Sequence, residues 1–418
     1  MYSKKILIFI FLCNAFFAKA QTNKLQFKDG TSEKRASFYN KVINSINKTI
    51  ALPFTEQYDE NWQSAFYNIG LVQYKTAAVN KKIEDASKIL LSQSIDFQKA
   101  FVNLINSNYQ SQYSGAVQLI FSSTTDSKLL AMAANYLLQK ATLAEKKVMN
   151  GTVLDKLSTT PNNTILQELS KQIQSSISNI KIPSLKPFFT KEYLPKTLLV
   201  FSFQRKDRNY PGMAMVRDTN GNFVRTKAGK YFNIGQLARS NSNMPGYITN
   251  GNTPQGIFRI TGFDTSSNYF IGPTPNLQLA MPHEYNRSEL EEGNIIDTTW
   301  TLSSYANLLP PIFRKYEPMF GTFYAGKIGR TEIISHGTTI DAEYYKSTAY
   351  YPYTPTAGCL CTKEKWSSKT GFLEKSDQLL LYEAVKNAGN PIGYLIVIEI
   401  DDIKSEVSIS DIEKYLPK

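Results

Sequence analysis

The stretch IKIPSLKPFFTKEYLPKTLLVFSF, residues 180–203, separates two kinds of sequence pattern. Before it, apolar residues recur at the three- and four-residue spacing of amphipathic helices. Within it, Pro183, Pro187 and Pro195 interrupt any helix, and the run from Leu198 to Phe203 is apolar and typical of a strand. We therefore expect a domain boundary near residue 190, with an all-helical accessory domain over 21–190 and a mainly β domain over 191–418.

Three apolar stripes indicate the helices of the first domain. Their members are Trp62, Phe66 and Ile69; Phe97, Phe101, Leu104 and Ile105; and Leu130, Ala133, Ala134, Leu137 and Leu138. The last stripe follows Thr125 and Asp126, which are both suitable N-cap residues. Short helices at regular spacing predict stacked helix pairs that resemble a HEAT array. We expect the aromatic members to lie in the core rather than in a binding site.

The second domain contains clear turn and cap signals. Asn220-Gly221 separates two strand-like pieces and predicts a hairpin, because both positions tolerate a positive φ angle. A late helix is predicted from Ser376 as its N-cap to Gly389 at its end, followed by a strand from Tyr394 to Ile400.

The segment MYSKKILIFIFLCNAFFAKA, residues 1–20, has the basic start, short apolar run and A-x-A end of a secretory signal peptide. We expect cleavage after Ala20, which removes Cys13 and lowers the formal charge from +12 to +9 through loss of Lys4, Lys5 and Lys19. A basic exported protein suits an anionic partner such as cell wall or lipid headgroups, and export argues against nucleic acid. No later stretch is apolar enough to span a membrane, so we expect an exported protein of the periplasm or cell envelope.

The chain has two histidines, and one of them precedes a cysteine closely. His336 ends an apolar strand in RTEIISHGTT, and Cys359 follows 23 residues later between Gly358 and Leu360. A thiol needs a base or a positive field to react as thiolate, and a histidine within hydrogen-bond reach supplies both. We interpret Cys359 as a nucleophile and His336 as its base, the alternative being a buried structural cysteine and a satisfied core histidine. His283 has polar neighbours and is expected at the surface.

Cys361 lies two residues beyond Cys359 and has several explanations. A disulfide between the two would close a very small, strained ring. Zinc would need further soft ligands that the mature chain lacks, so neither a metal nor another cofactor is expected. A small packing residue is the simplest interpretation, with a redox or resolving role as the alternative.

Three segments together resemble the catalytic domain of the bacterial L,D-transpeptidases. GNTPQGIFRITGF supplies a T-P-x-G pattern, ISHGTT supplies the histidine with its glycine, and TPTAGC supplies a hydroxyl residue, glycine and the cysteine. The resemblance covers roughly residues 196–400 and leaves the helical domain outside it.

The resemblance implies a cysteine acyltransferase that acts on peptidoglycan stem peptides. Cys359 would attack the peptide carbonyl before the terminal D-alanine, and His336 would move the proton. The Gly337 carbonyl would fix the histidine tautomer, and backbone N–H groups around Gly358 and Cys359 would stabilise the oxyanion. The thioester would pass to the amine of an acceptor stem.

Further site residues are expected near the cysteine, some from the resemblance and some, such as Tyr353, from their position in the sequence. The residues expected to bind substrate are Thr338, Tyr353, Thr356 and Ala357. The segment between Met281 and His336 is long for a connection and is expected to cap the cleft. Thr253, Pro254 and Gly256 are expected to shape a turn and a strand entry.

Two positions depart from the family pattern. Ala357 stands where the family usually has histidine, and Cys361 stands where it has arginine or asparagine. The acyl acceptor is therefore open between an amine and water, and water would make the protein an L,D-carboxypeptidase or cross-link hydrolase. The alternative outside enzymes is an inactive wall-binding or scaffolding protein whose helical domain recruits envelope proteins.

Overall fold

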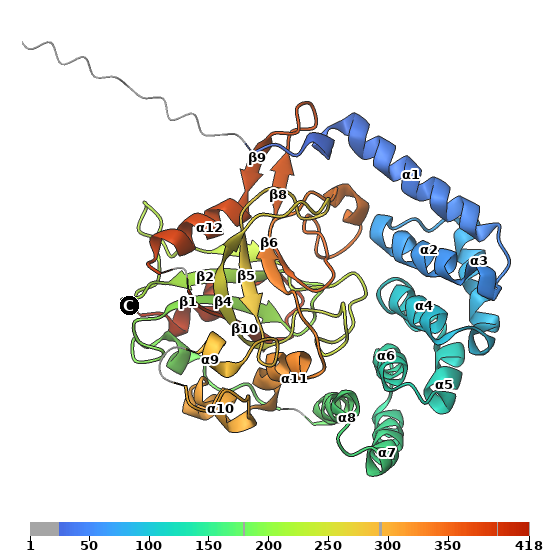
Figure 1. The fold of residues 1–418 in the computed structure, drawn as a ribbon, viewed down its shortest axis with the longest axis horizontal. Coiled ribbons are helices and arrows are strands. Elements are labelled where there is room, and N and C mark those ends of the chain that lie inside the picture. Colours follow the sequence, from blue (N-terminus) through green and yellow to red (C-terminus); the bar gives the residue numbers. More distant parts are fainter. Residues whose placement is uncertain (1–24, 179, 292–294, 391, 418) are drawn as a thin grey trace, which may run out of the picture.

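The computed structural model describes residues 25–178, 180–291, 295–390 and 392–417. The signal peptide expected over residues 1–20 lies outside this described part. In the described part, a helical N-terminal region is followed by a mixed sheet of eight strands with helices around it (Figure 1).

Helices of the N-terminal region follow one another in an arc along one side of the molecule (Figure 1). They are α1 (Ser32–Ile50), α2 (Asp59–Val72), α3 (Ala77–Lys88), α4 (Ile95–Asn108), α5 (Ser114–Ser123), α6 (Ser127–Leu138), α7 (Leu143–Thr159) and α8 (Thr164–Ile177). Contacts join α5 to α6 and α7 to α8, while α2, α4, α6 and α8 contact one another in succession. The helices therefore stack in a layered series.

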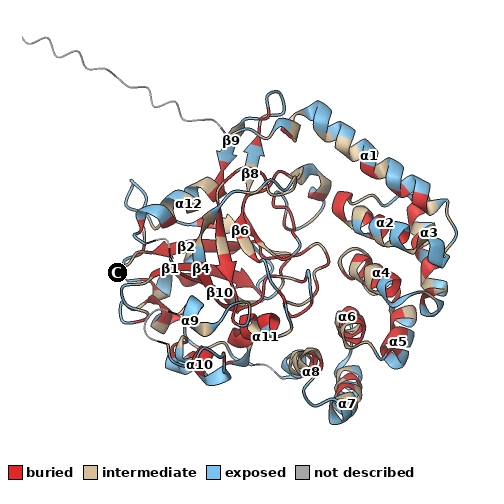
Figure 2. Cartoon of the chain, in the orientation of Figure 1, coloured by how far each residue is buried: buried red, intermediate tan, exposed pale blue. Residues whose placement is uncertain are grey.

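Local sequence explains where these helices begin and which face they bury. Asp126 caps α6 by accepting from the backbone N–H of Leu129, as its side chain was expected to do. Trp62, Phe66 and Phe101 are each at most 1 % exposed, which confirms that these aromatic residues form a core. The outer helices α1 and α3 keep exposed faces (Figure 2), whereas each residue of α6 is buried or half-buried.

The eight-stranded sheet has the order β3-β2-β1-β10-β4-β5-β6-β7. Its strands are β1 (Leu198–Arg205), β2 (Gly212–Arg217), β3 (Ile234–Gln236), β4 (Gly256–Asp264), β5 (Asn276–Ala280), β6 (Ile334–His336), β7 (Leu360–Cys361) and β10 (Gly393–Asp401). The pairs β1·β10 and β6·β7 are parallel and the other pairs are antiparallel. A separate hairpin joins β8 (Glu364–Trp366) to β9 (Leu373–Ser376).

The two edges of the sheet meet and nearly close it into a barrel. Leu237, directly after β3, forms an antiparallel bridge with Cys361 of β7. Both backbone hydrogen bonds of this bridge are present, at 2.7 and 2.9 Å. In the interior of the nearly closed sheet, the side chain of Gln236 accepts a hydrogen bond from Ser202 and donates one to Ser335. A buried polar network therefore links β1, β3 and β6.

The C-terminal region is less purely β than the sequence pattern indicated. Its helices are α9 (Arg287–Leu290), α10 (Leu302–Asn307), α11 (Gly321–Lys327), α12 (Asp377–Asn387) and α13 (Ile409–Ile412). The predicted Ser376 cap of α12 and the strand after it are confirmed. The turn at Asn220-Gly221 is also present, with Gly221 at φ +79°.

The segment between β5 and β6, expected to cap the cleft, packs mainly against the sheet. Tyr305, Phe313 and Met319 are at most 1 % exposed and belong to the same apolar core as β1 and β10. Tyr305 also donates to the Met319 carbonyl and accepts from the backbone N–H of Ile257 in β4. Most of this segment forms a core layer, because packing on the sheet removes its aromatic side chains from water.

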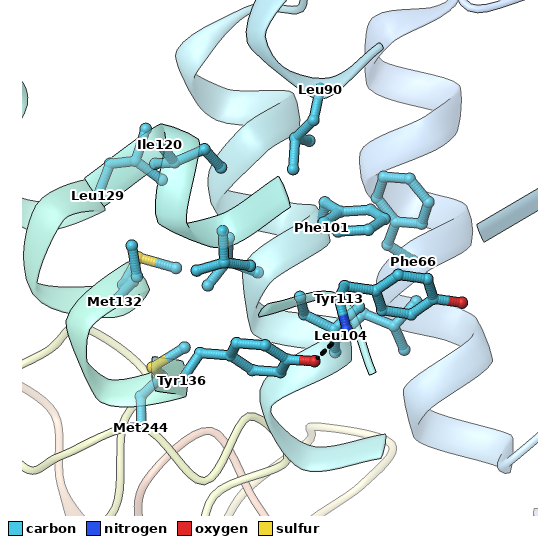
Figure 3. Packing of buried hydrophobic residues seen from close by; sticks show 14 of the residues in the cluster. Phe66, Leu90, Phe101, Leu104, Tyr113, Ile120, Leu129, Met132, Tyr136 and Met244 are labelled. Carbon is cyan, nitrogen blue, oxygen red and sulfur yellow. Dashed lines mark hydrogen bonds between the residues drawn. The ribbon is translucent and has the colours of Figure 1, made fainter. Parts of the chain in front are cut away.

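The helical region and the sheet region share contacts. Met244, from the chain between β3 and β4, lies in the helical core close to Tyr136 (Figure 3). Asn106 of α4 donates to the backbone carbonyls of Ser242 and Asn243. Tyr345 donates to the carbonyl of Leu71 at the end of α2. Apolar and polar contacts thus hold the helices against the loops that surround β7.

Candidate active site

Strands β6 and β7 place the expected histidine and cysteine side by side. Their parallel register pairs His336 with Cys361, so Cys359 lies just before the start of β7. Ser335 points into the polar interior, where it accepts from Gln236. Because neighbouring side chains on a strand alternate, His336 lies on the other face. The pairing of two strands distant in sequence therefore brings both residues to one sheet edge.

The His336 ring is held in one tautomer. It is 4 % exposed, and its Nδ1 contacts the carbonyl of Gly337. A carbonyl only accepts, so Nδ1 carries the hydrogen and Nε2 keeps a free lone pair. Burial lowers the pKa of His336 to about 4, while the contact with Gly337 acts in the opposite direction. The imidazole is therefore neutral near pH 7, the form that accepts a proton.

The Cys359 thiol is half-buried and protonated at rest. Its Sγ contacts the carbonyl of Glu332 at 3.7 Å. Burial raises the pKa of Cys359, and this outweighs the backbone of Ile334 and the charge of Arg330, which both lower it. In the resting structure the thiol and the imidazole thus make their hydrogen bonds to different carbonyls. A proton transfer between them would accompany attack on a bound carbonyl, since catalytic contacts commonly tighten only with substrate.

Arg330 places a buried cation beside the cysteine loop. It is 5 % exposed and donates to the carbonyls of Gly246, Gly251 and Asn252, the last two at 2.6 and 2.7 Å. Burial lowers the pKa of Arg330 to about 10, and the Cys359 thiolate would raise it. The guanidinium is still charged at neutral pH. These three hydrogen bonds all go to neutral carbonyls, so none of them neutralises the charge, which can act on a nearby anion.

Gly358 is required where the loop passes Arg330. Its φ is +124°, and an added Cβ would overlap the guanidinium of Arg330 and lie 2.5 Å from the Gly251 carbonyl. Thr253, from the T-P-x-G pattern, donates to the Gly358 carbonyl at 2.8 Å. As expected, β4 begins at Gly256, directly after this turn. These contacts fix the backbone immediately before Cys359.

Thr356 completes the loop from within. Its Oγ1 donates to the Cys359 carbonyl and accepts from the Gly358 N–H, both at 2.9 Å. The Gly358 N–H was expected to stabilise an oxyanion, but here it is used inside the loop. Thr356 is therefore a support of the loop, while Ala357 beside it is exposed.

Tyr353 and Thr338, also expected to bind substrate, are buried, as Thr356 is. Tyr353 is 1 % exposed and donates to Glu406, and its hydroxyl fills the space beside Gly235. The Thr338 hydroxyl pairs with Thr354 at 2.8 Å, and the Thr338 carbonyl accepts from a tryptophan side chain. Both side chains serve the packing behind the loop and lie away from solvent.

Glu364 is a site residue that the sequence did not indicate. Its carboxylate accepts from the Thr338 N–H at 3.0 Å and from the Ser376 hydroxyl at 2.6 Å. It occupies the space where a side chain on Gly337 would begin, so it fixes the turn whose carbonyl holds His336. Burial raises the pKa of Glu364 to about 7. Neither Glu364 nor Arg330 belongs to a recognisable motif, and their positions follow only from the folded chain.

Cys361 is a packing residue at the closure of the sheet. Its side chain is buried against Thr354 and the Gly337 carbonyl, and burial raises its pKa to about 12. Both cysteines are free thiols. His283, in contrast, is exposed as expected and packs edge-on against Phe323.

No family model, curated protein or solved structure matches this chain. Within the described ranges, histidine, cysteine and carboxylate side chains do not gather into a group suited to a metal ion. None of the described helices has the length and apolar character needed to cross a membrane.

Proposed function

We propose that the protein is a cysteine acyltransferase of the L,D-transpeptidase kind that acts on peptidoglycan stem peptides. The observation that carries this proposal is the neutral His336, fixed through Nδ1 by the Gly337 carbonyl, on the strand paired with the one that Cys359 precedes. The three motif segments also lie together: Thr253 donates to the Gly358 carbonyl, and β6, which carries His336, pairs with β7 directly after Cys359. Substrate identity comes from the resemblance of these motifs.

The proposed reaction has two steps. Sγ of Cys359 attacks the carbonyl before the terminal D-alanine, and Nε2 of His336 takes the thiol proton. The C–N bond then breaks as His336 gives that proton to the departing D-alanine amine, leaving a thioester. In the second step an acceptor amine attacks the thioester, its proton passes through His336, and the free thiol is regenerated.

The charge of Arg330 assists both steps in this proposal. Negative charge develops first on sulfur and then on the carbonyl oxygen, and a buried cation next to the loop stabilises both. The Gly358 N–H already donates to Thr356. The charge of Arg330 therefore supplies part of the stabilisation of the carbonyl oxygen that this backbone donor would otherwise provide.

Mass spectrometry of the intact protein tests the function. After incubation with purified tetrapeptide stems, we expect an added mass equal to the acyl group on Cys359, and the same residue should react with a carbapenem. Cys361→Ala is the matched control and should still be acylated, whereas Cys359→Ala should not. His336→Gln should remain folded and lose acylation.

An unmodified wild-type protein that still binds wall material independently of Cys359 would favour the scaffolding role. If acylation occurs, the released product identifies the acceptor: a cross-linked dimer indicates an amine, and a free tripeptide indicates water. We also propose export to the cell envelope, for which N-terminal sequencing of the mature protein should begin at Gln21.

A further inference from the structure

A single amide group joins Glu364 to His336. The carbonyl of Gly337 and the N–H of Thr338 belong to the same planar peptide unit, which is trans. The carbonyl contacts Nδ1 of His336, and the N–H donates to Oε2 of Glu364 at 3.0 Å. In a trans peptide the C=O and N–H bonds point in opposite directions. The place of the Glu364 carboxylate therefore sets the direction of the carbonyl that holds the imidazole.

The carboxylate itself is held from a second side. Glu364 begins β8 and pairs with Ser376 across the hairpin of β8 and β9. The Ser376 hydroxyl donates to Oε1 of Glu364 at 2.6 Å and accepts from the backbone N–H of Leu379 at 2.8 Å. Both carboxylate oxygens thus accept a hydrogen bond, which suits the ionised form, because an ionised carboxylate only accepts.

Gly337 provides the room for this approach. A Cβ atom added to Gly337 would overlap the carboxylate of Glu364. The φ angle of Gly337 is not positive, so the backbone conformation alone does not require glycine here. The absence of a side chain therefore matters because it lets the carboxylate lie directly against the amide.

The carboxylate strengthens the contact between the amide and the ring. A hydrogen bond to an ionised acceptor is stronger than a neutral one, and hydrogen bonds in a chain polarise one another. Acceptance by Glu364 thus makes the Gly337 carbonyl a better acceptor for the Nδ1 hydrogen of His336. In triads of the serine-protease kind a carboxylate accepts from the imidazole directly. Here one amide lies between the two groups, and no proton needs to cross it.

The geometry points to Glu364 as a positioning residue, which holds the Nδ1–H tautomer of His336 through the amide between Gly337 and Thr338. The carbonyl expected from the sequence to fix this tautomer therefore has a carboxylate behind it. The effect on catalysis rests on the proposed function, whereas the tautomer is a property of the resting protein.

Nitrogen NMR of the protein with isotope-labelled histidine tests the tautomer without chemistry. The chain has two histidines, and the exposed His283 is an internal reference. At pH 8 the carboxyl of Glu364 is ionised, since burial raises its pKa to about 7. We expect the wild-type His336 to carry its hydrogen on Nδ1. In Glu364→Gln the amide NH₂ faces one of the two donors, so the Nε2–H tautomer should become populated.

The rate of Cys359 acylation by a carbapenem is the second measurement. A ring that carries its hydrogen on Nε2 cannot take the thiol proton at that nitrogen. Glu364→Gln should therefore slow acylation by about 10- to 100-fold, the range expected for loss of a hydrogen bond to a charged group. Gly337→Ala displaces the same carboxylate from the other side and should reproduce both changes.

Two control variants separate this role from a general support of the turn. Trp366 donates through Nε1 to the carbonyl of Thr338 at 2.8 Å, and this carbonyl belongs to the next amide. Trp366→Phe loosens the same turn and should keep the Nδ1–H tautomer and the acylation rate. Glu374→Gln removes a carboxylate of the same hairpin from its exposed ion pair with Lys365 and should also change neither.

An unchanged tautomer in Glu364→Gln overturns the positioning role, even where acylation slows. An equal change of tautomer in Trp366→Phe also overturns it, because loosening of the turn is then a sufficient cause. Melting temperatures establish that each variant is folded, and Gly337→Ala carries the same test where Glu364→Gln fails to fold. A tautomer that depends on Glu364 without acylation of wild-type Cys359 keeps the positioning role and removes the proposed function. Acylation with an insensitive tautomer does the reverse.

Discussion

Acidification should destabilise the fold through His336 by a predictable amount. The ring is 4 % exposed and has a pKa of about 4 in the folded protein, compared with about 6.5 in an unfolded chain. On lowering the pH, the unfolded chain therefore takes up a proton before the folded one. The stability that the neutral ring provides is fully present above pH 6.5 and is lost as the pH falls toward 4.

The magnitude follows from the two pKa values. At pH 5 nearly every unfolded ring is protonated and few folded ones are, so the loss relative to neutral pH is about 2 kcal/mol. Glu168 and Glu364 act in the opposite direction, because burial raises the pKa of each to about 7. These carboxyl groups are common to the wild type and to His336→Gln, so comparison of the two proteins cancels them.

Urea unfolding of both proteins at pH 7 and pH 5, followed by circular dichroism, measures the effect. The free energy of unfolding of the wild type, minus that of His336→Gln, should fall by about 2 kcal/mol between the two pH values. A difference that stays constant within about 0.5 kcal/mol would refute the burial argument. The same pKa places the acidic limb of Cys359 acylation near pH 4, and a limb near pH 6.5 would contradict it.

Three substitutions test the supports of the loop. Thr253→Val removes the buried donor to the Gly358 carbonyl. The free energy of unfolding in urea should fall by about 1–3 kcal/mol, and acylation of Cys359 should be slower. Unchanged values of both would show that the contact is dispensable. Gly358→Ala should lower the free energy of unfolding by about 1–3 kcal/mol through backbone strain, and the added Cβ should also displace Arg330. An unaltered melting temperature would contradict the positive φ angle. Cys361→Ser buries a hydroxyl group and should lower the free energy of unfolding by about 1–3 kcal/mol. Carbapenem labelling of Cys359 should be unchanged, and loss of labelling would instead indicate Cys361 as the nucleophile.

Local pattern was sufficient for the elements whose cause is local. The Asp126 cap, the Ser376 cap and the turn at Gly221 each depend on residues within a few positions of one another, and each is present. Apolar spacing likewise identified the buried faces of α2 and α4. The spacing of apolar residues does not reveal which element covers the apolar face of a helix. The segment between β5 and β6 was therefore expected over the cleft, although most of it packs on the sheet.

Site residues with distant partners could not be predicted in this way. Arg330 binds carbonyls 78 to 84 residues away in the sequence, and nothing near it distinguishes it from an ordinary surface arginine. Glu364 fixes a turn 26 residues earlier. Tyr353 was expected at the cleft because it precedes the cysteine, whereas the fold turns it toward Glu406.

The bridge between Leu237 and Cys361 has a consequence for the order of folding. It joins the two edges of the sheet, and the strands between those edges include β10, which ends at Asp401. Contacts of such long sequence separation form late, because the entropy of closing large loops must be lost first. The pairing of β6 with β7 does not depend on this closure. What the closure adds is contact between the cysteine loop and the chain after β3, where Ser240 bridges Thr356. A chain whose sheet has not closed therefore lacks this support of the cysteine loop. Under the proposed function, such a chain should label more slowly with a carbapenem at Cys359 than the folded protein.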